Sequence, residues 1–287
     1  MPFIESHDDT ELYVKDWGYG RPVVLLHGWP LSSDTFDDLG MAIADAGMRA
    51  IAYDRRGFGR SEQPWEGYDY DTLADDLAAV LEAVDAVDAT LVGFSMGGGE
   101  VARYLSRHGD DRVAQAVLIA SVVPYLMLAD DNPEGVDPTI FDMMATGIQR
   151  DRAKFWDDFF KDFYGIGVLT QPVSGEVLAW SSAVAMQASL KATLACAEAF
   201  ATTDFRPDLP SITVPTLIVH GTSDQTVPIE TSARKAAAAI PGSRLIEYDG
   251  APHGLLASHK DEIARDLLEF LAACPARETE GALRARY

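Results

Sequence analysis

Short apolar runs alternate with amphipathic helical patterns over residues 23–119 and again over residues 216–271. Most of the runs are apolar throughout, which is typical of strands that are covered on both faces. Between two of them, Leu73, Leu77 and Leu81 recur at helical spacing. The alternation predicts an α/β fold with a mostly parallel sheet flanked by helices. The expected strands are residues 23–26, 49–53, 89–92, 113–119, 216–219 and 244–248.

Residues 121–205 interrupt this alternation. They contain no clear strand, and they hold 11 of the 27 aromatic residues in less than a third of the chain. We interpret them as a helical cap inserted between two strands. Most of the aromatic side chains are expected to attach the cap to the sheet, and a few to face a pocket. The predicted units are a first core segment (1–120), the cap (121–205), a second core segment (206–275) and a charged C-terminal tail (276–287).

The sequence Gly93-Phe94-Ser95-Met96-Gly97 lies between an apolar run and a helical pattern. A G-x-S-x-G sequence in this position is typical of a nucleophile elbow, a sharp turn without room for side chains two residues either side of the serine. The turn lifts the hydroxyl above the sheet. It also leaves the Met96 N–H at a helix N-terminus, where it can donate to an oxyanion. We therefore expect Ser95 to be a catalytic nucleophile.

A serine hydroxyl needs a general base, and the base needs a carboxylate that fixes its tautomer. In folds with this elbow, the acid and the histidine follow the serine in that order. Asp224 and His253 each come shortly after an expected strand. Both should therefore lie at the same edge of the sheet as Ser95, where open α/β sheets bind ligands. The sequence predicts a catalytic triad of Ser95, Asp224 and His253.

The loop after the first apolar run is expected to supply a second oxyanion donor, the backbone N–H of Trp29. With Met96 it would complete the oxyanion hole. The Trp29 side chain should also form a wall of the pocket, although a tryptophan is more often simply part of the core. No spacing typical of a metal site is visible, so neither a metal nor a cofactor is expected. The expected pocket residues are Trp29, Val122, Phe160, Phe163 and Val227.

Other histidines and charged residues are interpreted as structural. His27 and His220 each end an expected strand beside a glycine, where a structural hydrogen bond is the more common role. Asp54, Arg55 and Arg56 are expected to form an ion pair that braces a loop rather than a phosphate site.

Several stretches resemble the cofactor-free bacterial haloperoxidases, also called perhydrolases, which group with aryl esterases and a γ-lactamase among the α/β-hydrolases. The resemblance extends over residues 3–273, and the chain departs from it at Gly98-Gly99, where the family usually has a threonine or a bulkier residue. It implies the α/β-hydrolase fold, the same triad and oxyanion donors, and no cofactor. The matching stretches are residues 27–30, 53–61, 67–71, 93–104, 130–133 and 250–256.

The resemblance also implies a second activity. Hydrogen peroxide can replace water in acyl transfer, and the resulting peracid oxidises halide without haem or metal. Pro30 resembles the version of the oxyanion loop that favours peroxide. The physical reason is that the fixed φ and missing N–H of proline redirect nearby backbone oxygens.

The predicted function is hydrolysis of small carboxylic esters through an acyl-enzyme, with perhydrolase side activity. One alternative is a lactamase or a carbon–carbon bond hydrolase with the same triad, which a substrate panel would separate. An alternative of another class is a ligand-binding protein without catalysis. The intact triad argues against it, and a fluorophosphonate probe on Ser95 would decide. A dehalogenase or an epoxide hydrolase is disfavoured, because those enzymes carry a carboxylate at the elbow.

The net charge of −22 argues against nucleic acid and anionic membranes as partners. No apolar run reaches about 18 residues and the first ten residues contain no Lys or Arg, so neither a membrane span nor a secretory signal is expected. Cys196 and Cys274 are interpreted as inert thiols in a reducing cytoplasm. The expected partner is a small acyl substrate, with hydrogen peroxide as a second one, and a homo-oligomer is left open.

The acidic residues are spread over the whole chain, with 30 Asp and 15 Glu against 17 Arg and 6 Lys. One interpretation is an acidic composition without special meaning. The other is adaptation to a salt-rich cytoplasm, where screening relieves the repulsion between surface carboxylates.

Raising the KCl concentration should therefore raise the melting temperature. The Debye length falls from about 10 Å at 0.1 M salt to about 3 Å at 1 M, which removes most of the repulsion between neighbouring carboxylates. Thermal unfolding followed by circular dichroism between about 0.1 and 2 M KCl measures this, and NaCl should act alike because the mechanism is screening. A constant melting temperature would contradict the interpretation of the acidic composition as an adaptation to salt.

Overall fold

The structure of the protein, a computed structural model, describes residues 2–273. The expected C-terminal tail (276–287) and Cys274 lie outside the described residues. Within residues 2–273, no helix combines the length and the apolar character that crossing a bilayer requires.

An eight-stranded sheet forms the centre of the fold, in the order β1-β2-β4-β3-β5-β6-β7-β8. Strands β3 to β8 pair in parallel, whereas β1 and β2 are antiparallel to their neighbours. Every residue of β3, β5, β6 and β7 is buried, which is why these strands read as continuous apolar runs. The strands are β1 (Phe3–Glu5), β2 (Glu11–Gly18), β3 (Pro22–Leu26), β4 (Arg49–Tyr53), β5 (Ala89–Phe94), β6 (Val113–Ile119), β7 (Thr216–Gly221) and β8 (Arg244–Tyr248).

The six expected strands correspond to β3 to β8, and the structure adds β1 and β2 at one edge of the sheet. In β2, the buried residues Leu12 and Val14 alternate with more exposed ones, so this strand has no continuous apolar run. Strands β5 and β7 each extend two residues beyond the expected end, to Phe94 and Gly221. Those extra residues bring the chain to the edge where the site lies.

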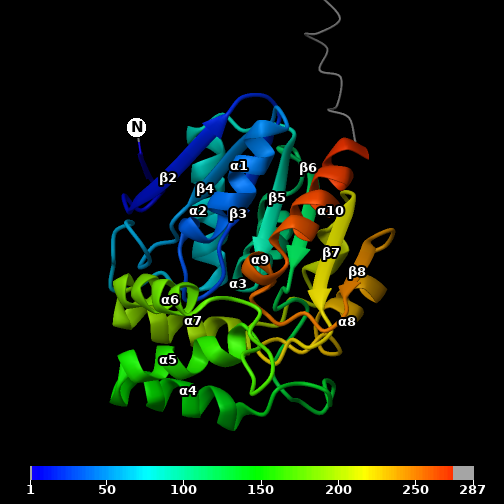
Figure 1. Cartoon of the computed structure of the whole chain (residues 1–287). Coiled ribbons are helices and arrows are strands. Elements are labelled where there is room, and N and C mark those ends of the chain that lie inside the picture. Colours follow the sequence, from blue (N-terminus) through cyan, green and yellow to red (C-terminus); the bar gives the residue numbers. More distant parts are fainter. Residues whose placement is uncertain (1, 274–287) are drawn as a thin grey trace, which may run out of the picture.

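Helices cover both faces of the sheet (Figure 1). α1 and α10 pack together on one face, and α2 and α3 pack together on the other, where α8 covers β7 and β8. A buried Gln115 in β6 connects the sheet to α10, because its Nε2 donates to the Phe270 carbonyl at 3.1 Å. The helices are α1 (Asp37–Asp45), α2 (Tyr70–Ala83), α3 (Met96–His108), α4 (Pro138–Arg150), α5 (Arg152–Phe163), α6 (Gly175–Gln187), α7 (Leu190–Thr202), α8 (Ala233–Ala239), α9 (Leu255–Ser258) and α10 (Lys260–Ala273).

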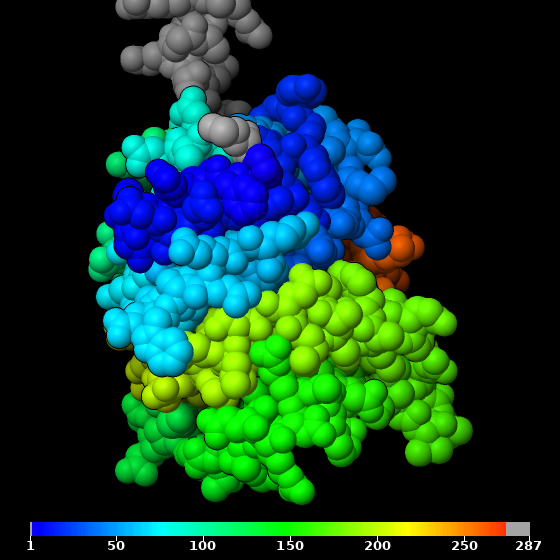
Figure 2. Space-filling view, turned by 90° about the vertical axis from the view of Figure 1, so that its left-hand side faces the viewer, coloured from blue at the N-terminus to red at the C-terminus, as the bar shows by residue number. Residues whose placement is uncertain are grey.

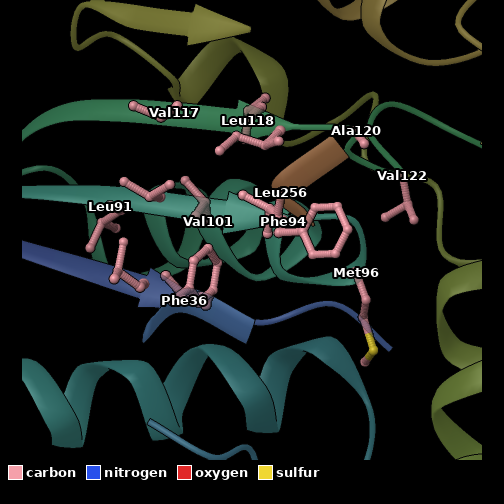
Figure 3. Close-up of a cluster of buried hydrophobic side chains, with 14 of the residues drawn as sticks. Phe36, Leu91, Phe94, Met96, Val101, Val117, Leu118, Ala120, Val122 and Leu256 are labelled. Carbon is pink, nitrogen blue, oxygen red and sulfur yellow. The ribbon is translucent and has the colours of Figure 1, made fainter. Parts of the chain in front are cut away.

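The apolar core continues to the carboxyl ends of the strands. Figure 3 shows Leu91 and Val117 on neighbouring strands, with Val101 of α3 close to them. Met96 and Val122 lie beyond the strand ends, towards the cap helices. Both are fully or almost fully buried. At these two residues, the carboxyl edge of the sheet is therefore shielded from solvent.

Helices α4 to α7 lie between β6 and β7 in the chain and cover the carboxyl ends of the strands (Figure 1). In Figure 2 they form a continuous layer, green to yellow-green, beneath the N-terminal strands. The Ser189 N–H donates to the Gly57 carbonyl at 2.8 Å. Gly57 has a φ of +80°, and a Cβ there would lie 2.3 Å from the Ala192 Cβ, so α7 packs directly on this glycine. The expected helical cap is confirmed, whereas the unit boundaries at residues 120, 205 and 275 stay predictions.

Candidate active site

Ser95 stands in a sharp turn between β5 and α3, with φ 55° and ψ −117°. A Cβ on Gly93 would lie 2.4 Å from the Gly97 carbonyl oxygen, and one on Gly97 would lie 2.3 Å from the Leu26 carbonyl oxygen. The turn therefore requires both glycines. The Ser95 N–H donates to the Ile119 carbonyl at 2.8 Å, which holds the strained residue against β6.

The structure brings the three expected triad residues together from the loops after β5, β7 and β8. His253 Nε2 lies 3.0 Å from Ser95 Oγ, and His253 Nδ1 lies 2.7 Å from Asp224 Oδ2. A carboxylate can only accept, so Nδ1 carries the proton and Nε2 presents its lone pair to the Ser95 hydroxyl. All three residues are buried. The arrangement can move a proton from Ser95 to His253 and stabilise the imidazolium that forms.

The Asp224 carboxylate is fully hydrogen-bonded. Its Oδ1 accepts the backbone N–H groups of Thr226 at 2.9 Å and Val227 at 2.8 Å. Burial by itself raises the pKa of Asp224, but the charge of His253 and hydrogen bonds from His220 and His253 outweigh it and lower the pKa to about 2. The carboxylate therefore stays ionised at any pH near neutrality.

His220 contacts the same carboxylate, a role that sequence reasoning missed. Its Nε2 lies 2.8 Å from the Val227 carbonyl oxygen and 3.2 Å from Asp224 Oδ2. Its buried Nδ1 has no hydrogen-bond partner among the described residues, so the proton belongs on Nε2, which faces two acceptors. The signal in the sequence is the spacing: His220 precedes Asp224 by four residues, at the end of the same strand.

Met96 directly follows Ser95 in the chain, and Trp29 lines the same cavity as Ser95. A Cβ on Gly28 would lie 3.0 Å from the Ser95 Cβ, so the loop after β3 runs directly against the elbow. Within residues 2–273, neither the Trp29 nor the Met96 backbone N–H donates to an acceptor of the protein. Two free donors beside a nucleophile are the requirement for an oxyanion hole.

A buried ion pair holds the loop after β3 against α3. The Arg55 guanidinium pairs with Glu100 of α3, with 2.6 Å between Nε and Oε1, and its Nη2 donates to the His27 carbonyl at 2.6 Å. The Arg55 backbone N–H donates to His27 Nε2 at 3.0 Å. Burial lowers the pKa of His27 to about 3, so the ring is neutral and structural. Glu100 was not singled out in the sequence, because nothing there shows that a glutamate on this helix is buried.

The expected ion pair among Asp54, Arg55 and Arg56 is wrong, because each residue has its own partner elsewhere. Asp54 pairs with Arg60 at 2.8 Å. Arg56 pairs with Asp76 of α2 at 2.6 Å, and both of these side chains are buried. The three residues point in different directions along an irregular stretch, so they brace the loop by connecting it to several elements.

A cavity of about 440 Å³ opens above Ser95 between the sheet and the cap. Of the expected pocket residues, Trp29, Val122 and Val227 line it, and Phe160 and Phe163 do not. The remaining lining residues are Ser95, Leu126, Val136, Ile140, Phe141, Met143, Met144, Phe155, Asp158, Phe159, Asp162, Phe200, Gln225 and Thr226.

The difference follows from the orientation of α5. Trp156, Phe160 and Phe163 form its buried stripe, while Phe155 and Phe159 lie on the face towards the cavity. Phe163 instead packs edge-on against the His253 ring, with centroids 4.8 Å apart. It therefore supports the imidazole rather than a substrate.

Trp29 connects the core to the cap. Its Nε1 donates to the Thr193 carbonyl of α7 at 3.0 Å, and its ring packs against Trp156, Phe159 and Phe200. The Trp29 side chain therefore both lines the cavity and belongs to the packed interface between the core and the cap.

The fold and this geometry define the class of protein. A family model described as alpha/beta hydrolase fold matches residues 21–260, and the chain belongs to this family. A non-heme chloroperoxidase of Kitasatospora aureofaciens is 44% identical, over 94% of this chain and 99% of the relative. A bifunctional esterase/perhydrolase of Acinetobacter calcoaceticus is 40% identical, also over 94% of this chain and 99% of the relative.

Among solved structures, a bromoperoxidase from Bacillus anthracis is similar to this chain with a TM-score of 0.91 and 46% identity, over 94% of this chain and 99% of that one. The expected fold class is therefore confirmed. The expected resemblance to haloperoxidases and perhydrolases is confirmed as well.

The geometry around His253 predicts a pH dependence. A protonated imidazole cannot accept the Ser95 proton, so kcat/KM should fall on acidification. Asp224 keeps its charge as the pH is lowered because its pKa is about 2, and His27 stays neutral because its pKa is about 3. Initial rates with a chromogenic ester between about pH 5 and 8 measure the profile. A flat profile would contradict His253 as the base.

Proposed function

We propose that this protein is a serine esterase in which Ser95 is the nucleophile, His253 the general base and Asp224 its orienting carboxylate. The observation that carries the proposal is the 3.0 Å contact between Ser95 Oγ and His253 Nε2 at the floor of an apolar cavity. Ser95 Oγ attacks the ester carbonyl carbon while its proton moves to His253. The N–H groups of Trp29 and Met96 hold the resulting oxyanion.

The intermediate collapses when the alcohol leaves with the proton from His253, and the acyl group stays on Ser95. Water then attacks the acyl-enzyme and gives a proton to His253. The bond between the acyl carbon and Ser95 Oγ breaks as His253 returns that proton to Oγ, which releases the acid and free Ser95. Hydrogen peroxide in place of water gives a peracid by the same proton movements. The chloroperoxidase, bromoperoxidase and esterase/perhydrolase relatives support this second reaction.

The cavity limits the substrate class. About 440 Å³ of mostly apolar space suits a small carboxylic ester rather than a polymer. The exposed carboxylate of Asp162 lies at its margin and disfavours an anionic substrate, whereas Asp158 at the same margin is paired with Lys154 at 2.6 Å. We propose small uncharged esters as substrates.

We also propose a reducing, cytoplasmic location and an acidic surface adapted to salt. The buried thiol of Cys196, which has no disulfide partner within the described part of the chain, supports the first. Burial raises its pKa to about 12, so it carries no reactive thiolate. The spread of acidic residues over the whole chain supports the second.

Ser95→Ala should lower the esterase kcat by a factor on the order of 10⁶, as in other serine triads. The fold should persist, because the change removes one hydroxyl at the edge of the sheet, and circular dichroism checks this. Ser223→Ala, on the loop before Asp224, is the matched control and should retain activity. Retention of more than about a tenth of the wild-type turnover by Ser95→Ala would refute the nucleophile.

Two measurements separate the alternatives. A fluorophosphonate probe should label the wild type and spare Ser95→Ala, whereas a ligand-binding protein without catalysis would not be labelled. A panel of esters, γ-lactams and carbon–carbon cleavage substrates, with and without peroxide, should show the highest kcat/KM for esters.

Pro30→Leu should shift the ratio of perhydrolysis to hydrolysis towards hydrolysis. Pro30 follows the oxyanion residue Trp29 in a buried turn, which the Leu31 N–H closes on the Gly28 carbonyl at 3.0 Å. A residue with a free φ and an N–H can redirect the backbone oxygens there. Peracid and acid formed from one acyl donor give the ratio. An unchanged ratio would exclude a role of this loop in selecting peroxide.

A further inference from the structure

Two methionines of α4 line the cavity that contains Ser95. Met143 is 68% exposed and Met144 is partly buried against the core. We propose that the peracid formed at Ser95 oxidises both thioethers, so that Met143 and Met144 are a self-modification site. The proposal rests on the perhydrolase reaction of the proposed function.

The chemistry needs no reactant beyond those of that reaction. A sulfur lone pair attacks the outer peroxy oxygen of the peracid, and the O–O bond breaks. The oxygen stays on sulfur as a sulfoxide, and the peracid leaves as the carboxylic acid, which keeps the proton. Sulfur loses two electrons and the peracid gains them. The modification replaces an apolar, flexible side chain by a polar one.

Location selects these two methionines. One peracid molecule within about 440 Å³ corresponds to a local concentration of a few molar, and it is diluted as soon as it leaves. Met143 and Met144 meet the product before this dilution. Met96 adjoins Ser95 in sequence, but its side chain is fully buried and does not line the cavity.

Two other exposed methionines serve as internal references. Met41 of α1 is 59% exposed and Met186 of α6 is 42% exposed, and neither lines the cavity. Only peracid that has already reached bulk solution can oxidise them. The thiol of Cys196 does not compete, because it is buried and stays protonated.

Oxidation should change the site, because a sulfoxide places a strong acceptor on a mostly apolar wall. We expect KM for apolar esters to rise as turnovers with peroxide accumulate. Substitution by leucine keeps a similar volume and removes the sulfur.

The experiment compares peracid made in the cavity with peracid added from outside. The enzyme turns over a small ester with hydrogen peroxide in the presence of excess free methionine, which traps released peracid. Mass spectrometry of peptides then gives the sulfoxide fraction at each methionine. In parallel, Ser95→Ala receives the synthetic peracid, and wild type receives peroxide alone.

The readout is the sulfoxide fraction at Met143 and Met144 divided by the sulfoxide fraction at Met41 and Met186. This quotient should be at least fivefold higher for the enzyme during turnover than for Ser95→Ala with added peracid. Peroxide alone should give little sulfoxide at any of the four. Equal ratios in the two arms would overturn the proposal.

A second measurement follows inactivation. Each variant's rate is normalised to its own initial value. The double variant Met143→Leu/Met144→Leu should then be inactivated more slowly, per turnover, than Met41→Leu. Equal losses would also count against the proposal. Peracid is assayed separately by its oxidation of bromide. If no peracid forms, the perhydrolase function fails and this proposal with it. If peracid forms while the methionine ratios stay equal, only this proposal fails.

Discussion

The close approach of three backbone segments at the carboxyl edge of the sheet is the constraint on which the site depends. Gly97 packs on the Leu26 carbonyl, Gly28 on the Ser95 side chain, and Gly98 on Ser121, where a Cβ would lie 2.1 Å from the Ser121 hydroxyl oxygen. The loop after β3 and the start of α3 can approach Ser95 this closely because Gly28 and Gly97 have no side chain. The close contact with Ser121 gives Gly98 a packing role in this chain, and α3 begins at Met96.

Charge in this region is buried but balanced locally. Asp224 receives two backbone N–H groups and faces two histidine N–H groups, and Arg55 and Glu100 compensate each other beneath the oxyanion loop. Removing one member of such a pair typically destabilises a protein by about 3–5 kcal/mol, because an unpaired charge stays buried. These contacts hold backbone rather than substrate. They fix the loop after β3, which contains Trp29, to α3, which begins at Met96.

The sequence was most informative where chemistry dictates order and local shape. The elbow and the buried strands follow from local sequence patterns, and the order of Ser95, Asp224 and His253 follows from the chemistry that the elbow requires. Phe160 and Phe163 were misplaced, because the rotation of α5 against the sheet depends on long-range packing that a cluster of aromatics does not reveal. His220 was taken as structural only, because its four-residue spacing from Asp224 does not by itself show that its Nε2 faces that carboxylate.

The proposed triad and most of the cavity lining come from different parts of the chain, so the triad alone does not determine which substrate binds. Ser95, Asp224 and His253 belong to the loops of the sheet, whereas most of the cavity lining comes from residues 126–200. Trp29 is where the two meet, since its loop runs against Ser95 at Gly28 and its indole donates to the Thr193 carbonyl of α7. The cap and the loop after β3 are therefore joined at a residue that also lines the cavity. In the proposed mechanism, an acyl group that packs against Trp29 contacts the residue whose N–H would hold the oxyanion.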